Sequence, residues 1–166
     1  MKNKILLFVI PILLLVGCSM ANTPTSKVEE LFTKYQTLDT DINSGIESVL
    51  DEQNLSNSQK NRYRAILEKQ YKNLTYQIKE ETIDGDTATV VTEIEVTDLK
   101  KSISDLVYDS DIYTKQTYDE EKLNRLENAK DKVKYTLELA LSKNKDDEWE
   151  LNALTNEQIK KIQGMY

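Results

Sequence analysis

The sequence predicts an α+β domain, in which N-terminal helices pack on a curved antiparallel sheet of four strands and a helical insertion separates the two hairpins of that sheet. Three changes of pattern support this prediction. Apolar residues recur every three or four positions in residues 26–71, which is the helical period. They alternate with polar residues in 74–97 and again in 133–151, which is the period of a strand. Between these two stretches, residues 99–130 return to a helical and highly charged pattern.

Capping boxes mark where the helices begin. Ser26-Lys-Val-Glu29 precedes a long apolar stripe, and we expect a helix there that bends or divides at Gly45. Ser56-Asn-Ser-Gln59 predicts a second helix that runs through Tyr71. Thr155-Asn-Glu-Gln158 predicts the helix that closes the chain. The apolar stripes of these helices are typical of faces that pack into a core.

Two hairpins are expected after the first helices. Residues 74–97 alternate between apolar and polar side chains, and Asp84-Gly85 supplies the left-handed backbone that a tight turn requires. Residues 133–141 alternate in the same way, and Trp149 and Leu151 follow on the apolar face after a polar turn. Because each strand has one apolar and one polar face, the pattern predicts a sheet that is covered on one side.

The insertion at residues 99–130 has a thin apolar stripe. We expect one helix over Leu99–Val107 and a second that opens at Thr117-Tyr-Asp-Glu120. Three tyrosines recur here at a spacing of five, and they are Tyr108, Tyr113 and Tyr118. Two interpretations stay open: the tyrosines present aromatic surface to a partner protein, or they anchor a weakly amphipathic helix onto the domain.

Composition excludes several classes of function. The 166 residues suffice for one domain, and 22 Lys+Arg against 29 Asp+Glu give a formal net charge of −7. Such an acidic chain is not expected to bind nucleic acid, which requires clustered basic side chains. The sequence has no histidine, so Ser/His/Asp and Cys/His catalysis and most zinc sites are excluded. We therefore expect no catalytic residue, no metal site and no dissociable cofactor.

The first 17 residues are typical of a signal peptide. A short basic start, Met1–Lys4, precedes the apolar run Ile5–Val16, which is interrupted only by Pro11. This run is shorter than the ~20 residues that a membrane-spanning helix needs. The sequence therefore predicts export rather than a spanning anchor.

The end of this run resembles a bacterial lipobox, the signal for lipid attachment to a cysteine. Leu15, Val16 and Gly17 supply the small or aliphatic side chains that the signal peptidase recognises, and Cys18 is the single cysteine of the chain. We expect Cys18 to carry a covalent diacylglycerol, which would anchor the protein to the bacterial cell membrane on its extracytoplasmic side. Each buried CH₂ of the acyl chains contributes about 0.8 kcal/mol to this anchoring. The alternative is a buried apolar N-terminus with an incidental cysteine.

The predicted anchor sets the domain boundaries. Residues 1–17 form the signal peptide, and the small, polar residues 18–25 form a lipidated tether. Residues 26–166 form a single α+β domain, which this short tether would hold close to the bilayer.

The order of elements resembles the cystatin-like fold of the nuclear transport factor 2-like superfamily, and in particular small lipoproteins of low-GC Gram-positive bacteria that have no assigned function. The resemblance is carried by the lipobox, the helical insertion, and the segments Tyr71–Ile78, Ile83–Val90, Tyr135–Leu139 and Glu148–Leu151. It implies a curved sheet wrapped around a long helix, with a cavity between the sheet and the helices. The positions that it places near this cavity are Tyr76, Ile94, Tyr135, Leu137 and Trp149. The alternative is that these five residues are core residues.

Two classes of function remain. The first is a membrane-anchored binding or protein-interaction module, whose ligand is a protein or a small apolar molecule. The second is a small hydrolase or isomerase that uses a carboxylate and a tyrosine in the pocket between sheet and helices. The acidic residues lie mainly on helix surfaces or outward strand positions, which favours the first class. Asp84-Gly-Asp86 and Asp109-Ser-Asp111 lack the full spacing of a calcium loop and are read as turns.

Overall fold

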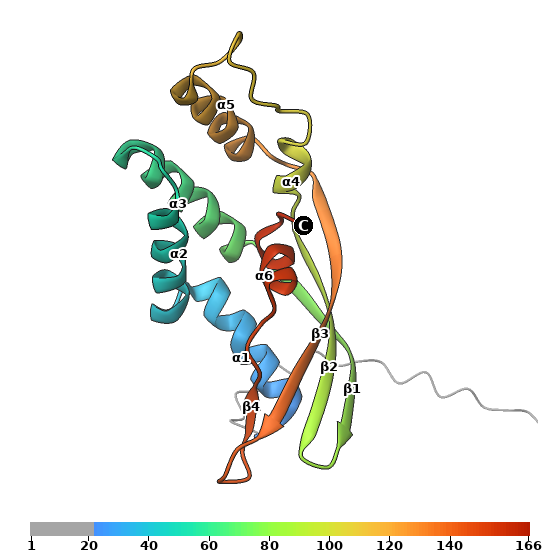
Figure 1. Cartoon of the computed structure of the whole chain (residues 1–166). Helices are drawn as coiled ribbons and strands as arrows, with labels where there is room; N and C mark the ends of the chain where they lie inside the picture. Colours follow the sequence, from blue (N-terminus) through green and yellow to red (C-terminus); the bar gives the residue numbers. More distant parts are fainter. Residues whose placement is uncertain (1–21) are drawn as a thin grey trace, which may run out of the picture.

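The computed structural model describes residues 22–166, and the predicted signal peptide and lipobox lie outside these residues. The described residues form six helices and four strands, which confirms the α+β prediction (Figure 1). The elements are α1 (Pro24–Thr37), α2 (Thr40–Glu52), α3 (Asn57–Lys72), β1 (Thr75–Asp84), β2 (Thr87–Thr97), α4 (Leu99–Ser102), α5 (Lys115–Glu127), β3 (Lys132–Lys143), β4 (Trp149–Leu151) and α6 (Asn156–Gln163). The strands form one antiparallel sheet in the order β1-β2-β3-β4. Over residues 22–166, the helices are all too short or too polar to cross a membrane.

The cap of helix α1 lies three residues before the predicted cap at Ser26. Thr23 is the N-cap, and its Oγ1 accepts a hydrogen bond of 3.1 Å from the backbone N–H of Ser26. Ser26 therefore occupies the third helical position rather than the cap, with Pro24 at the first turn. As a consequence, the last residues of the predicted tether are helical.

The predicted division of the first helix at Gly45 was wrong. The chain breaks at Leu38, which adopts a left-handed conformation with φ 53, and Asp39 then caps α2 by accepting a hydrogen bond from the N–H of Ile42. A capping aspartate starts a new helix more effectively than one glycine interrupts an existing one, because it satisfies a backbone donor. Gly45 lies inside α2, with no atom within 4 Å of the place where a Cβ would stand.

The predicted start of α3 and both hairpins are confirmed. Ser56 and Gln59 form the expected capping box. Gly85 has φ 58 in the turn between β1 and β2, and the inward positions of β2 are buried at every second residue. Strand β1 contains one irregularity, where the register shifts between Ile78 and Glu80.

The main core lies between the inner face of the sheet and helices α1, α2, α3 and α6 (Figure 1). Phe32 of α1 is fully buried, and its ring stacks on that of Tyr76 in β1 with centroids 4.7 Å apart. A smaller second cluster joins α3 to the insertion, and its buried members are Ile66, Leu99, Leu123 and Leu126. The insertion therefore has its own apolar contact with the body.

One core position carries an unsatisfied polar atom. Thr92 in β2 is fully buried, and its Oγ1 has no hydrogen-bond partner within residues 22–166. Replacing Thr92 with the isosteric valine removes this desolvated hydroxyl and is expected to raise the free energy of unfolding by about 1 kcal/mol. Urea denaturation measures the change. Thr89→Val, on the outer face of the same strand, is the control and is expected to stay within about 0.5 kcal/mol of the parent.

Candidate functional site

The insertion leaves and re-enters the body at one point, and we call residues 99–130 the arm. At its base, the backbone N–H of Asp98 donates to the carbonyl of Asp131 at 2.8 Å. The arm consists of the short α4, a loop over residues 103–114 and α5. In Figure 1 it lies at the end of the molecule opposite the β1–β2 turn.

The arm differs from the prediction in both helices. The first was expected to reach Val107 but ends at Ser102, and the second begins at Lys115 with Thr114 as its cap rather than at Thr117. The first helix ends at its cap, Ile103, and the hydroxyls of Ser102 and Ser104 donate to the carbonyls of Leu99 and Lys101. Further along the loop, Asp109 forms a local turn. Its side chain accepts from the N–H of Asp111 at 2.9 Å, and its carbonyl accepts from Ile112 and Tyr113.

An arginine on α3 holds α5 in place. Arg62 donates from Nε to Glu127 Oε1 and from Nη2 to Glu127 Oε2, both at 2.7 Å, and it also reaches Asn124 and Glu120. The planar guanidinium group of Arg62 can form two parallel hydrogen bonds to one carboxylate, whereas a lysine ammonium group cannot. The hydrogen bonds from Arg62 lower the pKa of the Glu127 carboxyl, so this contact is complete at neutral pH and weakens as the pH falls through that pKa.

Loss of this contact is expected to loosen the arm selectively. In Arg62→Gln, amide hydrogen exchange in α5 should accelerate about three- to tenfold, because the pair contributes on the order of 1 kcal/mol to arm docking. Arg64→Gln is the matched control, since Arg64 pairs with Glu47 on α2 and makes no contact to the arm among its hydrogen bonds. Equal acceleration in both variants, measured by mass spectrometry, would show that the Arg62 contact does not hold α5.

The three tyrosines of the arm form one cluster around Tyr118. Tyr108 and Tyr113 each meet the Tyr118 ring edge-on, with centroids 5.4 and 5.8 Å away. The hydroxyl of Tyr118 donates to the carbonyl of Leu106 at 3.4 Å. Tyr113 and Tyr118 therefore hold the loop on α5 within the arm, rather than anchoring a helix onto the rest of the domain, whereas Tyr108 remains 50% exposed.

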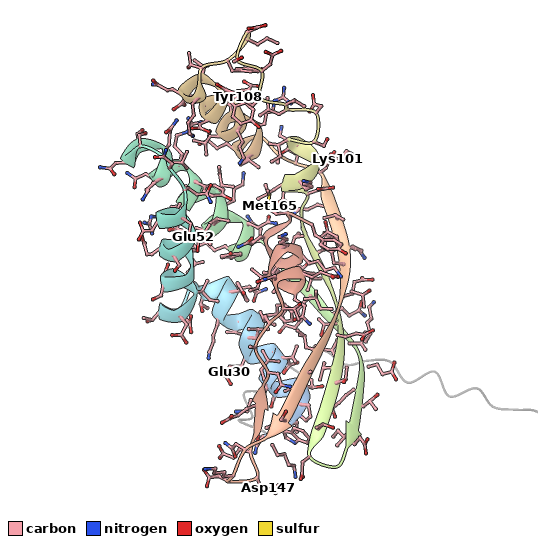
Figure 2. All side chains as sticks on the ribbon, in the orientation of Figure 1. Glu30, Glu52, Lys101, Tyr108, Asp147 and Met165 are labelled. Carbon is pink, nitrogen blue, oxygen red and sulfur yellow. The ribbon has the colours of Figure 1, made fainter. Side chains whose placement is uncertain are left out.

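The loop presents apolar side chains to solvent. Val107 is 73% exposed and Ile112 is 70% exposed, and together with Tyr108 they form what we call the apolar tip. Asp109 and Asp111 lie between them in the chain, and neither has an ion pair within residues 22–166. Figure 2 places Tyr108 and Asp147 at opposite ends of the molecule.

Sequence reasoning missed this tip. It assigned Val107 to a buried helical stripe and did not single out Ile112. The signal that could have found it is the run Val107-Tyr-Asp-Ser-Asp-Ile112, in which aspartate and serine disfavour a helix interior and leave the apolar residues without a buried face.

The five predicted pocket residues lie in or against the main core and do not surround a common hollow. Ile94, Leu137 and Trp149 are buried core residues. Tyr76 stacks on α1, and the hydroxyl of Tyr135 donates to the carbonyl of Tyr166 at 3.3 Å. Leu137 also forms part of the wall of a groove beside α6, and Trp149 part of the wall of a different hollow beside α1.

The largely apolar hollow at the base of the arm is lined by none of the five predicted residues. It encloses about 160 Å³ between α3 and α5, and its apolar wall includes Ile66, Leu99 and Leu126. This volume resembles that of a cavity that holds one benzene-sized molecule. It would accommodate only a small apolar ligand.

Two acidic side chains of the arm, Glu127 and Asp105, hydrogen-bond to arginines. The hydrogen bonds from Arg62 and Arg125 lower the pKa of Glu127 and Asp105, which is opposite to what a general base near neutral pH requires. Burial raises the pKa of the Tyr76 hydroxyl, with a smaller contribution from Glu29. Within residues 22–166, no three acidic or cysteine side chains gather in a way that could hold a metal ion.

Comparison with known proteins does not place the chain in a family. No family model, curated protein or solved structure matches it. The resemblance to cystatin-like lipoproteins therefore stays a prediction from the sequence.

Proposed function

We propose that this protein is a membrane-anchored, extracytoplasmic lipoprotein that acts as an interaction module, and that the apolar tip of its arm binds a partner protein. The observation that carries the proposal is the exposure of Val107, Tyr108 and Ile112 on a loop that internal contacts hold in one conformation. Such exposed apolar groups lose unfavourable contact with water when a partner covers them.

The shape of the tip favours a protein as its ligand. Tyr108 combines apolar area with a hydroxyl that can hydrogen-bond, which is a frequent property of interface residues. Because Tyr118 orders Tyr108, less conformational entropy is lost on binding. Asp109 and Asp111, which form no ion pair with residues 22–166, favour a partner groove that is apolar at its centre and basic at its rim. The same charges disfavour insertion into anionic lipid headgroups.

The proposed interaction can be tested in the cells that produce the protein. A photo-crosslinking amino acid at position 107 should yield a discrete adduct with one partner. The adduct should be lost when Ile112→Asp is added, because a charge at the centre of the contact is poorly tolerated. Ile83 is the matched control position, since it is 52% exposed but lies at the β1–β2 turn. If positions 107 and 83 give the same adducts, or position 107 gives none, the tip does not bind a specific partner.

The membrane anchor rests on the residues Leu15–Cys18, which lie outside the described part of the chain. We predict that the full-length protein incorporates labelled palmitate and partitions into the detergent phase, and that Cys18→Ser abolishes both. Ser19→Ala, at the neighbouring residue, should keep full labelling. Mass spectrometry of the native protein that shows a free thiol at Cys18 would contradict the lipid anchor.

A further inference from the structure

Strand β3 has a long edge that no strand covers. Strand β3 has 12 residues. Strand β4 has only three, and these pair with Leu141, Ser142 and Lys143 of β3. Figure 1 shows β4 beside one end of β3 only. The edge of β3 over residues 132–139 therefore lacks a strand partner on this side in the described structure. Such an edge is a template on which a further strand can pair.

Two hydrogen bonds outside the β3–β4 pairing show in which direction the backbone groups of β3 point. The carbonyls of Ala140 and Glu138 both point to this edge, because they accept from the N–H of Asn152 at 2.9 Å and from Gln158 Nε2 at 2.7 Å. Backbone groups alternate sides along a strand, and β3 pairs with β2 without a register shift. Lys134 and Thr136 therefore direct their N–H and C=O groups to the same open edge.

The side chains on this edge are self-complementary. If a second copy approaches antiparallel with Thr136 opposite Thr136, Lys134 of each copy lies opposite Glu138 of the other. Each of these pairs then exchanges two main-chain hydrogen bonds, once the exposed Gln158 side chain releases the Glu138 carbonyl. Opposite charges and paired threonines facing each other across strands are both stabilising.

A groove borders this edge of β3. It encloses about 380 Å³ between β3 and α6, and its walls include Thr136, Glu138, Thr155 and Gln158. The other edge of the sheet, on β1, is different. There the register shifts beside Lys79, and Glu81 accepts a hydrogen bond from the N–H of Thr25 at 2.9 Å. Irregular register and charged side chains make that edge a poor template.

We propose that two copies of this chain pair through the β3 edge, across a twofold axis at Thr136, so that their sheets join into one. Rotation about this axis leaves both Asn22 residues at the same height along it. The pairing does not depend on lipidation or on the apolar tip.

Charge reversal tests the pairing directly. The full-length protein in detergent should sediment as a dimer, and Glu138→Lys should raise the dimer dissociation constant at least tenfold, because lysine then faces lysine. Lys134→Glu should raise it as well, and this substitution also removes the 3.1 Å ion pair between Lys134 and Glu93 of the same chain. The double variant restores opposite charges across the axis and should recover dimerisation. A monomeric parent protein, or a double variant that dimerises no better than the single ones, would overturn the proposal. Circular dichroism confirms that each variant is folded.

A cysteine cross-link gives an independent test. Across the axis, the Cα atoms of the two copies of residue 136 would lie about 5.5 Å apart, within the range of a disulfide. Thr136→Cys should therefore yield a covalent dimer under mild oxidation in membranes. Thr82→Cys, on the β1 edge, should not. The Thr82→Cys variant also contains Cys18, so it controls for cross-linking through any Cys18 that is not lipidated. Equal cross-linking at both positions would count against the β3 edge.

Discussion

Replacing Gly164 with alanine is expected to lower the free energy of unfolding by about 2–5 kcal/mol. Gly164 ends α6 with φ 70, and a Cβ there would clash with the Thr97 carbonyl oxygen and with Gln70 Nε2. Neither group can move freely, because the buried Gln70 amide donates to the Thr97 carbonyl and accepts from the Thr97 N–H. The Gly164 carbonyl also accepts from Lys100 at 2.8 Å. The substitution would therefore disturb the junction of α3, β2, α4 and α6 together.

Gly45→Ala is the matched control for this substitution. Gly45 lies inside α2 with open space around its Cα, so alanine there should raise the free energy of unfolding by about 0.5–1 kcal/mol. Denaturation by guanidinium chloride measures both variants. Effects of similar size and sign at the two glycines would show that the left-handed cap and the close contact at Gly164 are not needed.

Replacing Phe32 with alanine is expected to lower the free energy of unfolding by about 3–5 kcal/mol. Its side chain is fully buried, and it stacks on Tyr76 where α1 crosses the sheet. Truncation removes apolar contacts and leaves a cavity that neighbouring helices and strands can close only in part. Thermal and chemical denaturation measure the loss.

Two variants separate cavity formation from loss of the ring stack. Phe32→Leu keeps most of the volume and should cost about 1–1.5 kcal/mol. Ile83→Ala removes an apolar side chain that is 52% exposed and should change stability by less than about 0.5 kcal/mol. A loss of under 1 kcal/mol for Phe32→Ala would mean that the packing between α1 and β1 is not central to the fold.

The prediction from sequence was best where a local signal agrees with the pattern around it. The capping box at Ser56 and the Asp84-Gly85 turn are each specified by a few adjacent residues, and both are present in the structure. The alternation of β2 was equally clear, because its inward positions pack on a single core. Errors occurred where signals compete. The first helix breaks at Leu38 before the Asp39 cap rather than at Gly45, and the helix that apolar spacing extended to Val107 ends at Ser102.

The candidate site was predicted only in part. The sequence indicated that residues 99–130 form an insertion with aromatic side chains, and the structure places Tyr108 on an exposed tip. The sequence could not indicate that Arg62, on a helix 65 residues earlier in the chain, orients α5 through Glu127. The five residues expected around one cavity lie in or against the main core, and two of them, Leu137 and Trp149, also line two separate hollows.

The sequence by itself determined the starts of α3 and α6, the hairpins and the inward face of the strands, because periodicity, caps and turns depend on residues close together in the chain. Only the tertiary structure decided which apolar residues stay exposed and which strand edge stays open. Val107 and Val90 are chemically alike, yet one is 73% exposed and the other fully buried. The difference arises because burial depends on what the rest of the chain places over a residue, and that information is not local.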